Sequence, residues 1–295
     1  MDNGLFPPGI RVGIAMPSMV DPGRMAAHII RPVDLKLARA KAQAQMLSEA
    51  IGPWSLRNPN VTTRCELREA RMGYRLIVDG FAEPPPLEDW SLQVGEWAHN
   101  LRSALDNLAF ALARLRCDPP PNPGRIAFPI SIDKSKFERE ARPTLEQMSD
   151  PAAQLVEKLQ PFNRDGSPSM GTPESDALVI LQWLNNADKH RVPSVILVGQ
   201  MDATHEGSIE YYSEEDAKAN TPPDTTVWGG PLAPGVVLLE LRTKNSIAKV
   251  SGRFNVRGTV AIETNNGHPA LILVIQSLTF YAAVVVDQFR AMFAG

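Results

Sequence analysis

The sequence predicts an α+β protein in which a bundle of helices packs with an antiparallel sheet. Three segments with apolar residues at helical spacing indicate the bundle, namely 87–116, 173–190 and 270–293. Residues 193–265 change to short β-branched or alternating segments separated by turn residues, which is typical of an antiparallel sheet. Because no series of β-α-β units appears, a doubly wound nucleotide-binding fold is disfavoured.

Composition narrows the class of protein. The 295 residues include 30 Lys and Arg against 33 Asp and Glu, and the formal net charge of −3 excludes a strongly basic nucleic-acid coat protein and a polyacidic tail. Hydrophobic residues make up 43% of the chain, an ordinary share for a globular protein, and the two cysteines cannot form a disulfide framework. Because thiols are few and no export signal is recognisable, we expect a cytoplasmic protein.

The first elements in chain order are an irregular segment, a helix and a hairpin. Prolines and glycines interrupt residues 1–32, which we expect to be irregular. Residues 33–51 are rich in Ala, Leu, Lys and Gln, and they predict a helix that Gly52-Pro53 ends. Alternating polar and apolar residues over 61–81 predict a β-hairpin with one solvent-exposed face.

The central helices are predicted by an apolar stripe and by helix-start signals. At about 100° per residue, eight apolar side chains of 87–116 fall on one side of a helix: Val94, Trp97, Leu101, Ala104, Leu105, Leu108, Leu112 and Leu115. Shorter helices are expected at 134–142 and 149–159. Thr172-Pro-Glu combines a capping hydroxyl, a first-turn proline and an acid near the positive end of the dipole, and it predicts the start of helix 173–190.

The last third of the chain is expected to hold the sheet and a covering helix. Strands are predicted at four segments, which the 61–81 hairpin is expected to join: 194–200, 208–212, 235–243 and 252–264. The polar, Pro- and Gly-rich stretch 213–234 predicts an exposed loop. Polar residues interrupt the apolar run of 270–293, so we interpret it as a helix buried in the protein and expect no membrane contact. Residues 33–295 thus form one domain, with a helical part at 87–192 and a mostly β part at 193–265.

A first polar cluster lies on the long helix. His99, Arg102 and Asp106 stand at i, i+3 and i+7, within about 60° of one another on a side away from the leucines. One interpretation is an ordinary solvated face. Phe110 projects from the same side one turn further on, which favours a second layer of protein over this face.

A second polar cluster ends the helix that starts at Thr172. Asn185 and Asp188 continue the inner face defined by leucines, within about 40° of Leu181. A buried carboxylate needs a partner, and Arg102 or His99 of the long helix could supply it. Cationic residues then follow where the negative end of the helix dipole favours them: Lys189, His190 and Arg191. The structural alternative is an Asp188–Arg ion pair with ordinary charge at the helix end.

Taken together, the two clusters predict a composite site between two helices. A histidine, His99 or His190, can act as acid or base near neutral pH. Arg102 and Lys189 can hold a phosphate, and Asp188 or Asp106 can orient the imidazole. A metal site is a further alternative because Glu96-x-x-His99 has the spacing of helical carboxylate sites, but no second such pair follows. No cofactor is expected.

Four motifs resemble those of a family of bacterial proteins without an assigned activity. They are His99-Asn-Leu-Arg-Ser-Ala-Leu-Asp106, Phe128-Pro-Ile130, the Gln-Pro turn in 159–162, and Asp188-Lys-His-Arg191. The resemblance covers about residues 87–192. It marks recurring positions and implies no chemistry by itself: His99, Arg102, Asp106, Asp188, Lys189 and His190.

The chain is also distantly similar to HEPN-type proteins, helical bundles in which an Arg-x4-6-His element cuts RNA without a metal, usually across a dimer. Asn185-x4-His190 has the spacing of that element but not its first residue, and Arg102 would have to take that role. The resemblance implies metal-independent RNA cleavage, with RNA and a second copy of the chain as partners. The alternatives are a non-enzymatic binding or scaffold protein with a protein partner, whose polar cluster is structural, and a metallohydrolase.

Overall fold

The computed structural model describes residues 22–57, 60–190, 193–201, 206–220, 224–253, 256–264 and 267–294. Within those ranges, the side chains of 22–26, 188–190, 200–201, 206–207 and 252–253 lie outside the described part.

The predicted α+β class is confirmed. The described residues form eight α-helices: α1 (Pro22–Leu56), α2 (Leu87–Arg116), α3 (Lys134–Glu140), α4 (Arg142–Leu145), α5 (Asp150–Lys158), α6 (Ala177–His190), α7 (Glu214–Ala219) and α8 (Leu271–Phe289). They also form eight strands: β1 (Val61–Leu67), β2 (Gly73–Phe81), β3 (Val195–Met201), β4 (Glu206–Tyr211), β5 (Asp224–Val227), β6 (Val237–Arg242), β7 (Ile247–Arg253) and β8 (Val256–Ile262).

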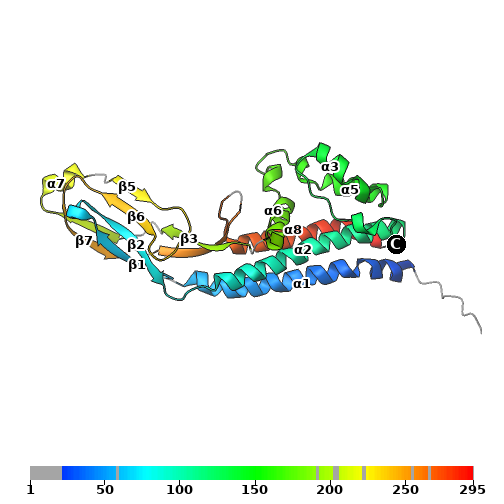
Figure 1. Cartoon of the computed structure of the whole chain (residues 1–295), viewed down its shortest axis with the longest axis horizontal. Helices are drawn as coiled ribbons and strands as arrows, with labels where there is room; N and C mark the ends of the chain where they lie inside the picture. The colour runs from blue at the N-terminus through cyan, green and yellow to red at the C-terminus, as the bar shows by residue number, and fades with distance from the viewer. Residues whose placement is uncertain are drawn as a thin grey trace, which may run out of the picture.

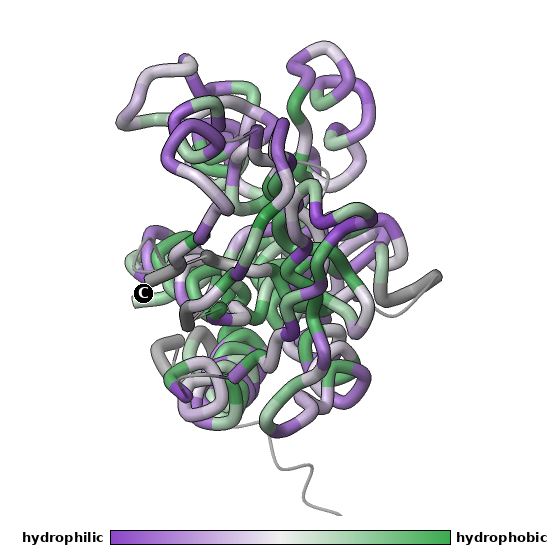
Figure 2. The backbone as a smooth tube through the Cα atoms, turned by 90° about the vertical axis from the view of Figure 1, so that its left-hand side faces the viewer, coloured by the Kyte–Doolittle hydropathy of each residue, from purple (hydrophilic) through white to green (hydrophobic). Residues whose placement is uncertain are grey.

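The molecule is elongated, with the long helices at one end and the strands, together with the short helix α7, at the other (Figure 1). The long helices α1, α2 and α8 run side by side, and α6 lies across α2 and α8 (Figure 1). Helices α3 and α5 form an outer layer beyond α6. Seen along the long axis, the apolar parts of the chain gather toward the middle and the polar parts toward the periphery (Figure 2).

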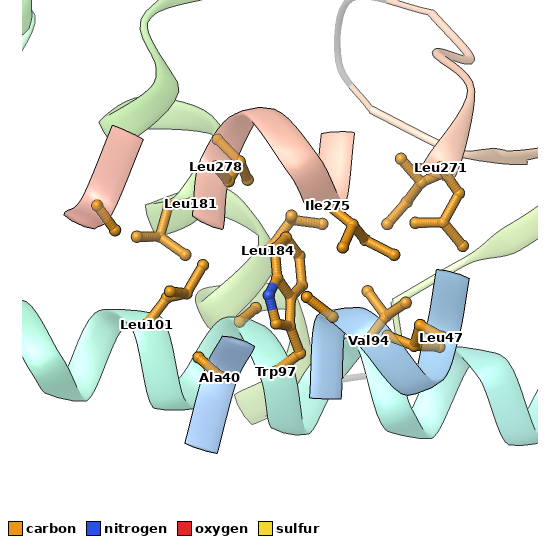
Figure 3. Packing of buried hydrophobic residues seen from close by; sticks show 14 of the residues in the cluster. Ala40, Leu47, Val94, Trp97, Leu101, Leu181, Leu184, Leu271, Ile275 and Leu278 are labelled. Atoms are coloured by element: carbon orange, nitrogen blue, oxygen red, sulfur yellow. The ribbon is translucent and has the colours of Figure 1, made fainter. Parts of the chain in front are cut away.

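The core of the bundle is formed by one face of each long helix. Trp97 and Leu101 of α2 meet Leu181 of α6 and Ile275 of α8 (Figure 3). The Trp97 side chain is fully buried, and its indole N–H donates to the Thr279 hydroxyl of α8 at 3.0 Å. A buried indole therefore has its polar atom satisfied, and α2 and α8 are fixed in register.

Helix α1 corrects the expectation for residues 1–32. It begins at Pro22, so residues 22–32 are helical rather than irregular, while 1–21 lie outside the described residues. The apolar side chains of Ile29, Ile30 and Val33 are buried, and α1 packs on the C-terminal end of α8. This burial outweighs the hydrogen bond that Pro32 cannot donate.

The expected end of the first helix at Gly52-Pro53 was also wrong. Helix α1 continues to Leu56, because Trp54 is buried and its indole N–H donates to the Glu83 carbonyl at 2.8 Å. The helix tolerates Pro53 because burying a large aromatic side chain stabilises the fold by about 2–3 kcal/mol, roughly in proportion to the apolar area removed from water.

The predicted 61–81 hairpin is present and joins the sheet. A four-stranded antiparallel sheet has the order β1-β2-β6-β5, and two antiparallel pairs join β3 to β8 and β4 to β7. The turn of the hairpin places Gly73 at φ 121°, and a Cβ there would lie 2.0 Å from the Leu241 carbonyl oxygen. Only glycine fits at this close approach of β2 to β6.

Residues 213–234, expected to be an exposed loop, contain a helix and a strand. Ser213 caps α7 by accepting a hydrogen bond from the Asp216 N–H at 3.1 Å, and three acids follow in the first turn. Strand β5 then pairs with β6 as an edge strand whose four residues are all exposed. Its exposure explains its polar sequence, which resembles that of a loop.

A buried asparagine just before β1 joins this part of the chain to β8. The Asn60 amide donates to the Gly258 carbonyl at 2.9 Å and accepts from the Gly258 N–H at 2.8 Å. Asn60 is only 1% exposed. Its side chain thus satisfies both backbone polar groups of one residue of β8, as a neighbouring strand would. This contact lies where β8 meets α1.

Helix α6 starts later than predicted and is positioned by an ion pair. Thr172 caps a 3-10 turn at Pro173–Ser175, and Asp176 then accepts from the Leu178 N–H at 2.8 Å at the start of α6. The Arg164 guanidinium donates to the buried Asp176 carboxylate at 2.5 Å and to the Tyr281 hydroxyl of α8 at 2.5 Å. Burial, together with the Asp176 charge, raises the pKa of Tyr281.

The C-terminal helix is close to its expected bounds, with α8 followed by a 3-10 turn at Arg290–Phe293. Leu271–Phe293 is long and apolar enough to cross a membrane by length and composition, with a mean hydropathy of 1.7. Its inner face lies in the core through Ile275, Val285 and Phe289, while Phe280 is 72% exposed.

Candidate ligand site between α2 and α6

The polar face of α2 is covered by an extended segment of chain. The Arg102 guanidinium forms an ion pair with the Asp106 carboxylate at 2.8 Å and donates a hydrogen bond to the Phe128 carbonyl at 2.6 Å. The Asp106 carboxylate in turn accepts from the Phe128 N–H at 2.9 Å. One ion pair on a helix therefore satisfies both backbone polar groups of the buried Phe128, in the way that a neighbouring strand would.

Two further side chains hold the same segment, 125–131. Gln160 is fully buried; it accepts from the Ser131 N–H at 3.1 Å and donates to the Pro129 carbonyl at 2.9 Å. The Thr144 hydroxyl donates to the Arg125 carbonyl at 2.9 Å. These side-chain contacts from α2, α4 and the chain after α5 keep the segment in place.

A polar hollow of about 400 Å³ lies between α2, α6 and this segment. We call it the amide pocket, because α6 contributes three side-chain amides to its lining: Gln182, Asn185 and Asn186. Arg102 and Asp106 line it from α2, and Glu140 lines it from α3. Its volume falls within the range of about 300–1,000 Å³ that is usual for small-molecule sites.

Two buried polar atoms of this pocket have no hydrogen-bond partner within the described residues, the Arg102 Nη1 and the Asn185 Oδ1. The Arg102 side chain is 14% exposed, and Asn185 is 3% exposed. Leaving a buried donor or acceptor unsatisfied costs about 1–3 kcal/mol each. Two such atoms in one hollow, a donor and an acceptor, are the strongest indication of a ligand in the described molecule.

Helical spacing explains how α6 presents its amides. Gln182, Asn185 and Asn186 stand at i, i+3 and i+4, and side chains at that spacing share one face of a helix. Leu181 and Leu184 lie on the neighbouring face and anchor α6 against α2 (Figure 3). The same packing that buries the leucines thus turns the amides toward Arg102.

The structure brings some of the predicted site residues together and separates others. Arg102, Asp106 and Asn185 line one pocket. His99 is exposed on α2, where its ring lies 3.4 Å from the Ser103 hydroxyl, and it does not line the pocket.

Most of the second cluster lies at the C-terminal end of α6. Asp188, Lys189 and His190 belong to the last turn of α6, but their side chains lie outside the described residues, as does Arg191. The partner expected for Asp188 was Arg102 or His99. Among the described side chains, Arg102 pairs with Asp106, one turn along its own helix, at i, i+4.

The metal alternative has little support from the residues around His99. Glu96, its expected partner, accepts a hydrogen bond from the Gln43 amide of α1 at 3.2 Å. Among the residues that the structure describes, no three His, Cys, Asp or Glu side chains gather as a metal would require.

A larger hollow, of about 640 Å³, lies between α6 and α8. Its walls are mostly apolar, with Trp183 and Ile180 of α6 facing Leu273 and Val274 of α8. None of its described lining atoms is a buried polar atom without a partner. The smaller amide pocket is therefore the better candidate for specific recognition, because specificity requires polar groups that only a ligand satisfies.

Sequence reasoning missed several residues of the site. Gln182 and Asn186 could have been found, since they lie three residues before and one residue after Asn185 on the same helix. Gln160 belongs to a motif that was recognised, but its full burial had no signal in the sequence. Arg125 lines the pocket from a 3-10 turn, and nothing in its local sequence indicates this.

Comparisons of the chain with protein-family models, with curated proteins and with solved structures find no match.

Proposed function

We propose that the protein binds a small ligand in the amide pocket, through one planar edge that carries an acceptor beside a donor. The observation that supports this is the pair of buried, unsatisfied atoms, Arg102 Nη1 and Asn185 Oδ1. The guanidinium nitrogen can only donate, and the amide oxygen can only accept. A ligand that satisfies both must therefore carry an acceptor for the guanidinium and a donor for the amide oxygen.

The chemistry of such an edge is that of an amide or lactam. A carboxamide, or the pairing edge of a nucleobase, has a carbonyl or ring nitrogen beside an N–H. Charge favours a neutral edge here, because the two charges of Arg102 and Asp106 already compensate each other. The amides of Gln182 and Asn186 add further donors and acceptors around it.

The experiment measures binding of the four nucleosides and of nicotinamide by saturation-transfer NMR. We expect at least one of them to bind to the wild type and to lose binding at least tenfold in Asn185→Leu, which keeps the branched shape and the number of heavy atoms but removes the acceptor. Ser208→Ala, on the exposed face of β4, serves as a control that leaves binding unchanged. Equal signals from wild type and Asn185→Leu would mean that only water fills the pocket, and would overturn the proposal.

A second candidate is metal-independent cleavage of RNA. One observation favours it: His190 follows Asn185 by five residues on the helix that lines the pocket, about 7.5 Å further along the axis. A base held by Asn185 would place the adjoining backbone near that end of α6. His190→Ala should then abolish cleavage of mixed-sequence RNA with an unchanged thermal midpoint, and the absence of any cleavage by the wild type would remove this candidate.

A further inference from the structure

A second hollow adjoins the amide pocket and has a different electrostatic character. This hollow, of about 380 Å³, is called here the arginine pocket and is lined by Arg125, Arg139, Arg142 and Glu146, among others. Three guanidinium groups and one carboxylate line this hollow, and a second carboxylate, Glu140, pairs with Arg139, so positive charge remains in excess. An anion is therefore favoured in this hollow, whereas the charges of Arg102 and Asp106 cancel in the amide pocket.

The two pockets share a wall. Arg125 lines both of them. On the opposite side, consecutive residues of α4 divide between them, because Pro143 lines the arginine pocket and Thr144 lines the amide pocket. One molecule could extend from one hollow into the other past Arg125.

The arginines are available for a ligand. Within the described residues, the Arg125 side chain makes no hydrogen bond or ion pair. Only the backbone N–H and C=O of Arg125 form hydrogen bonds. Arg139 and Arg142 contact Glu140 and Glu146, but both pairs are exposed to solvent. Exposed pairs of this kind are worth about 1 kcal/mol or less, so that a doubly charged anion can displace them.

The walls of the arginine pocket are fixed. Gln147 is only 7% exposed, and its side chain accepts from the Asn122 N–H at 2.8 Å and donates to the Pro143 carbonyl at 2.7 Å. This glutamine ties the 3-10 turn before Arg125 to helix α4. The arginines thus project from a rigid frame, which reduces the entropy lost when they bind an anion.

We propose that the ligand of the amide pocket is a phosphate monoester of the nucleotide kind, with its base edge on Arg102 and Asn185 and its phosphate in the arginine pocket. This inference rests on the proposed function, because it assumes that the amide pocket binds a planar edge. Guanidinium groups form paired hydrogen bonds with phosphate oxygens, and Arg125 lies where the two parts of the ligand would join.

The test compares each nucleoside with its 5′-monophosphate by isothermal titration calorimetry. For the best base, we expect the monophosphate to bind at least tenfold more tightly than the nucleoside, and this advantage to shrink in Arg125→Gln and as salt increases. Arg242→Gln, which replaces an arginine on the exposed sheet, is the matched control and should leave the advantage unchanged.

The outcomes separate the two proposals. If nucleoside and monophosphate bind equally and both depend on Asn185, the amide pocket stands and the phosphate site is overturned. If inorganic phosphate alone binds as tightly as the nucleotide and Asn185→Leu has no effect, both proposals fail. A tetranucleotide with a 5′-phosphate is compared with the mononucleotide, and tighter binding of the tetranucleotide would identify the end of an RNA chain as the source of the phosphate.

Discussion

Removing either member of the ion pair that holds Phe128 should destabilise the protein, but by very different amounts. Asp106→Ala removes the acceptor of the Phe128 N–H, which costs about 1–3 kcal/mol, and leaves the Arg102 charge without its carboxylate. Because the arginine side chain is only 14% exposed, that orphaned charge brings the total to about 3–5 kcal/mol.

The reverse substitution should cost less. Arg102→Met keeps most of the side-chain volume and removes the donor to the Phe128 carbonyl, at about 1–3 kcal/mol. The carboxylate left behind is 37% exposed, so water screens it and adds at most about 1 kcal/mol. Loss of the unsatisfied Arg102 Nη1 offsets part of this, and we expect a net destabilisation of about 2 kcal/mol.

Urea unfolding followed by tryptophan fluorescence measures both losses. The double variant Arg102→Met/Asp106→Ala should be no less stable than Asp106→Ala alone, because the orphaned charge is gone. Arg114→Met is the control: it breaks a pair of the same i, i+4 spacing at the C-terminal end of α2, at 2.7 Å to Asp118 just beyond the helix, and should cost under about 1 kcal/mol. An equal loss of stability for Asp106→Ala and Arg102→Met, or losses no larger than that of the control, would refute the idea that this ion pair holds Phe128 in place.

Three further predictions concern the scaffold. Asn60→Leu leaves the Gly258 N–H and C=O without partners, and it should lower the free energy of unfolding by about 2–4 kcal/mol in urea titrations. A loss under about 0.5 kcal/mol would show that these two hydrogen bonds do not stabilise the fold. Gly73→Ala adds a Cβ where a backbone carbonyl lies 2.0 Å away at φ 121°, and it should reduce soluble expression or lower the thermal midpoint by several degrees; an unchanged midpoint would contradict this. The hydrogen bond from the Lys136 N–H lowers the pKa of Asp133 at the start of α3, so its stabilisation is present above the unfolded-state pKa and is lost as pH falls through the lowered folded-state pKa. The stability difference between wild type and Asp133→Ala should therefore shrink toward zero in acid, and a difference that is constant with pH would show that the carboxylate charge has no part in the cap.

The sequence was most informative where a helix buries a continuous stripe. Segment 87–116 coincides with α2, because its apolar residues repeat at helical spacing over many turns and its ends carry prolines. Asn185 was expected on an inner face by the same arithmetic, and it is buried. Local pattern and burial agree in these cases, so the sequence alone is sufficient.

The sequence was least informative where a distant segment determines the outcome. Helix α1 passes through Pro32 because its apolar side chains pack on the end of α8, more than 250 residues away in the chain, where Arg290 reaches Asp34. Strand β5 looks like a loop because an edge strand has no need of an apolar face. The pairing of Arg102 with Asp106 was not predicted, because Asp106 was expected to orient a histidine ring. No local signal could show that Phe128 would lie across that face.

The 125–131 segment has an unusual consequence for amide hydrogen exchange. In a β-sheet, the slow exchange of one amide depends on the neighbouring strand as a whole. Here the Phe128 N–H depends on one carboxylate of α2, and the Ser131 N–H depends on one carboxamide after α5. Each of these amides therefore reports on a different part of the chain, and a single substitution should accelerate the exchange of one while the other stays protected. The wall of the pocket can thus loosen at one end without unfolding at the other.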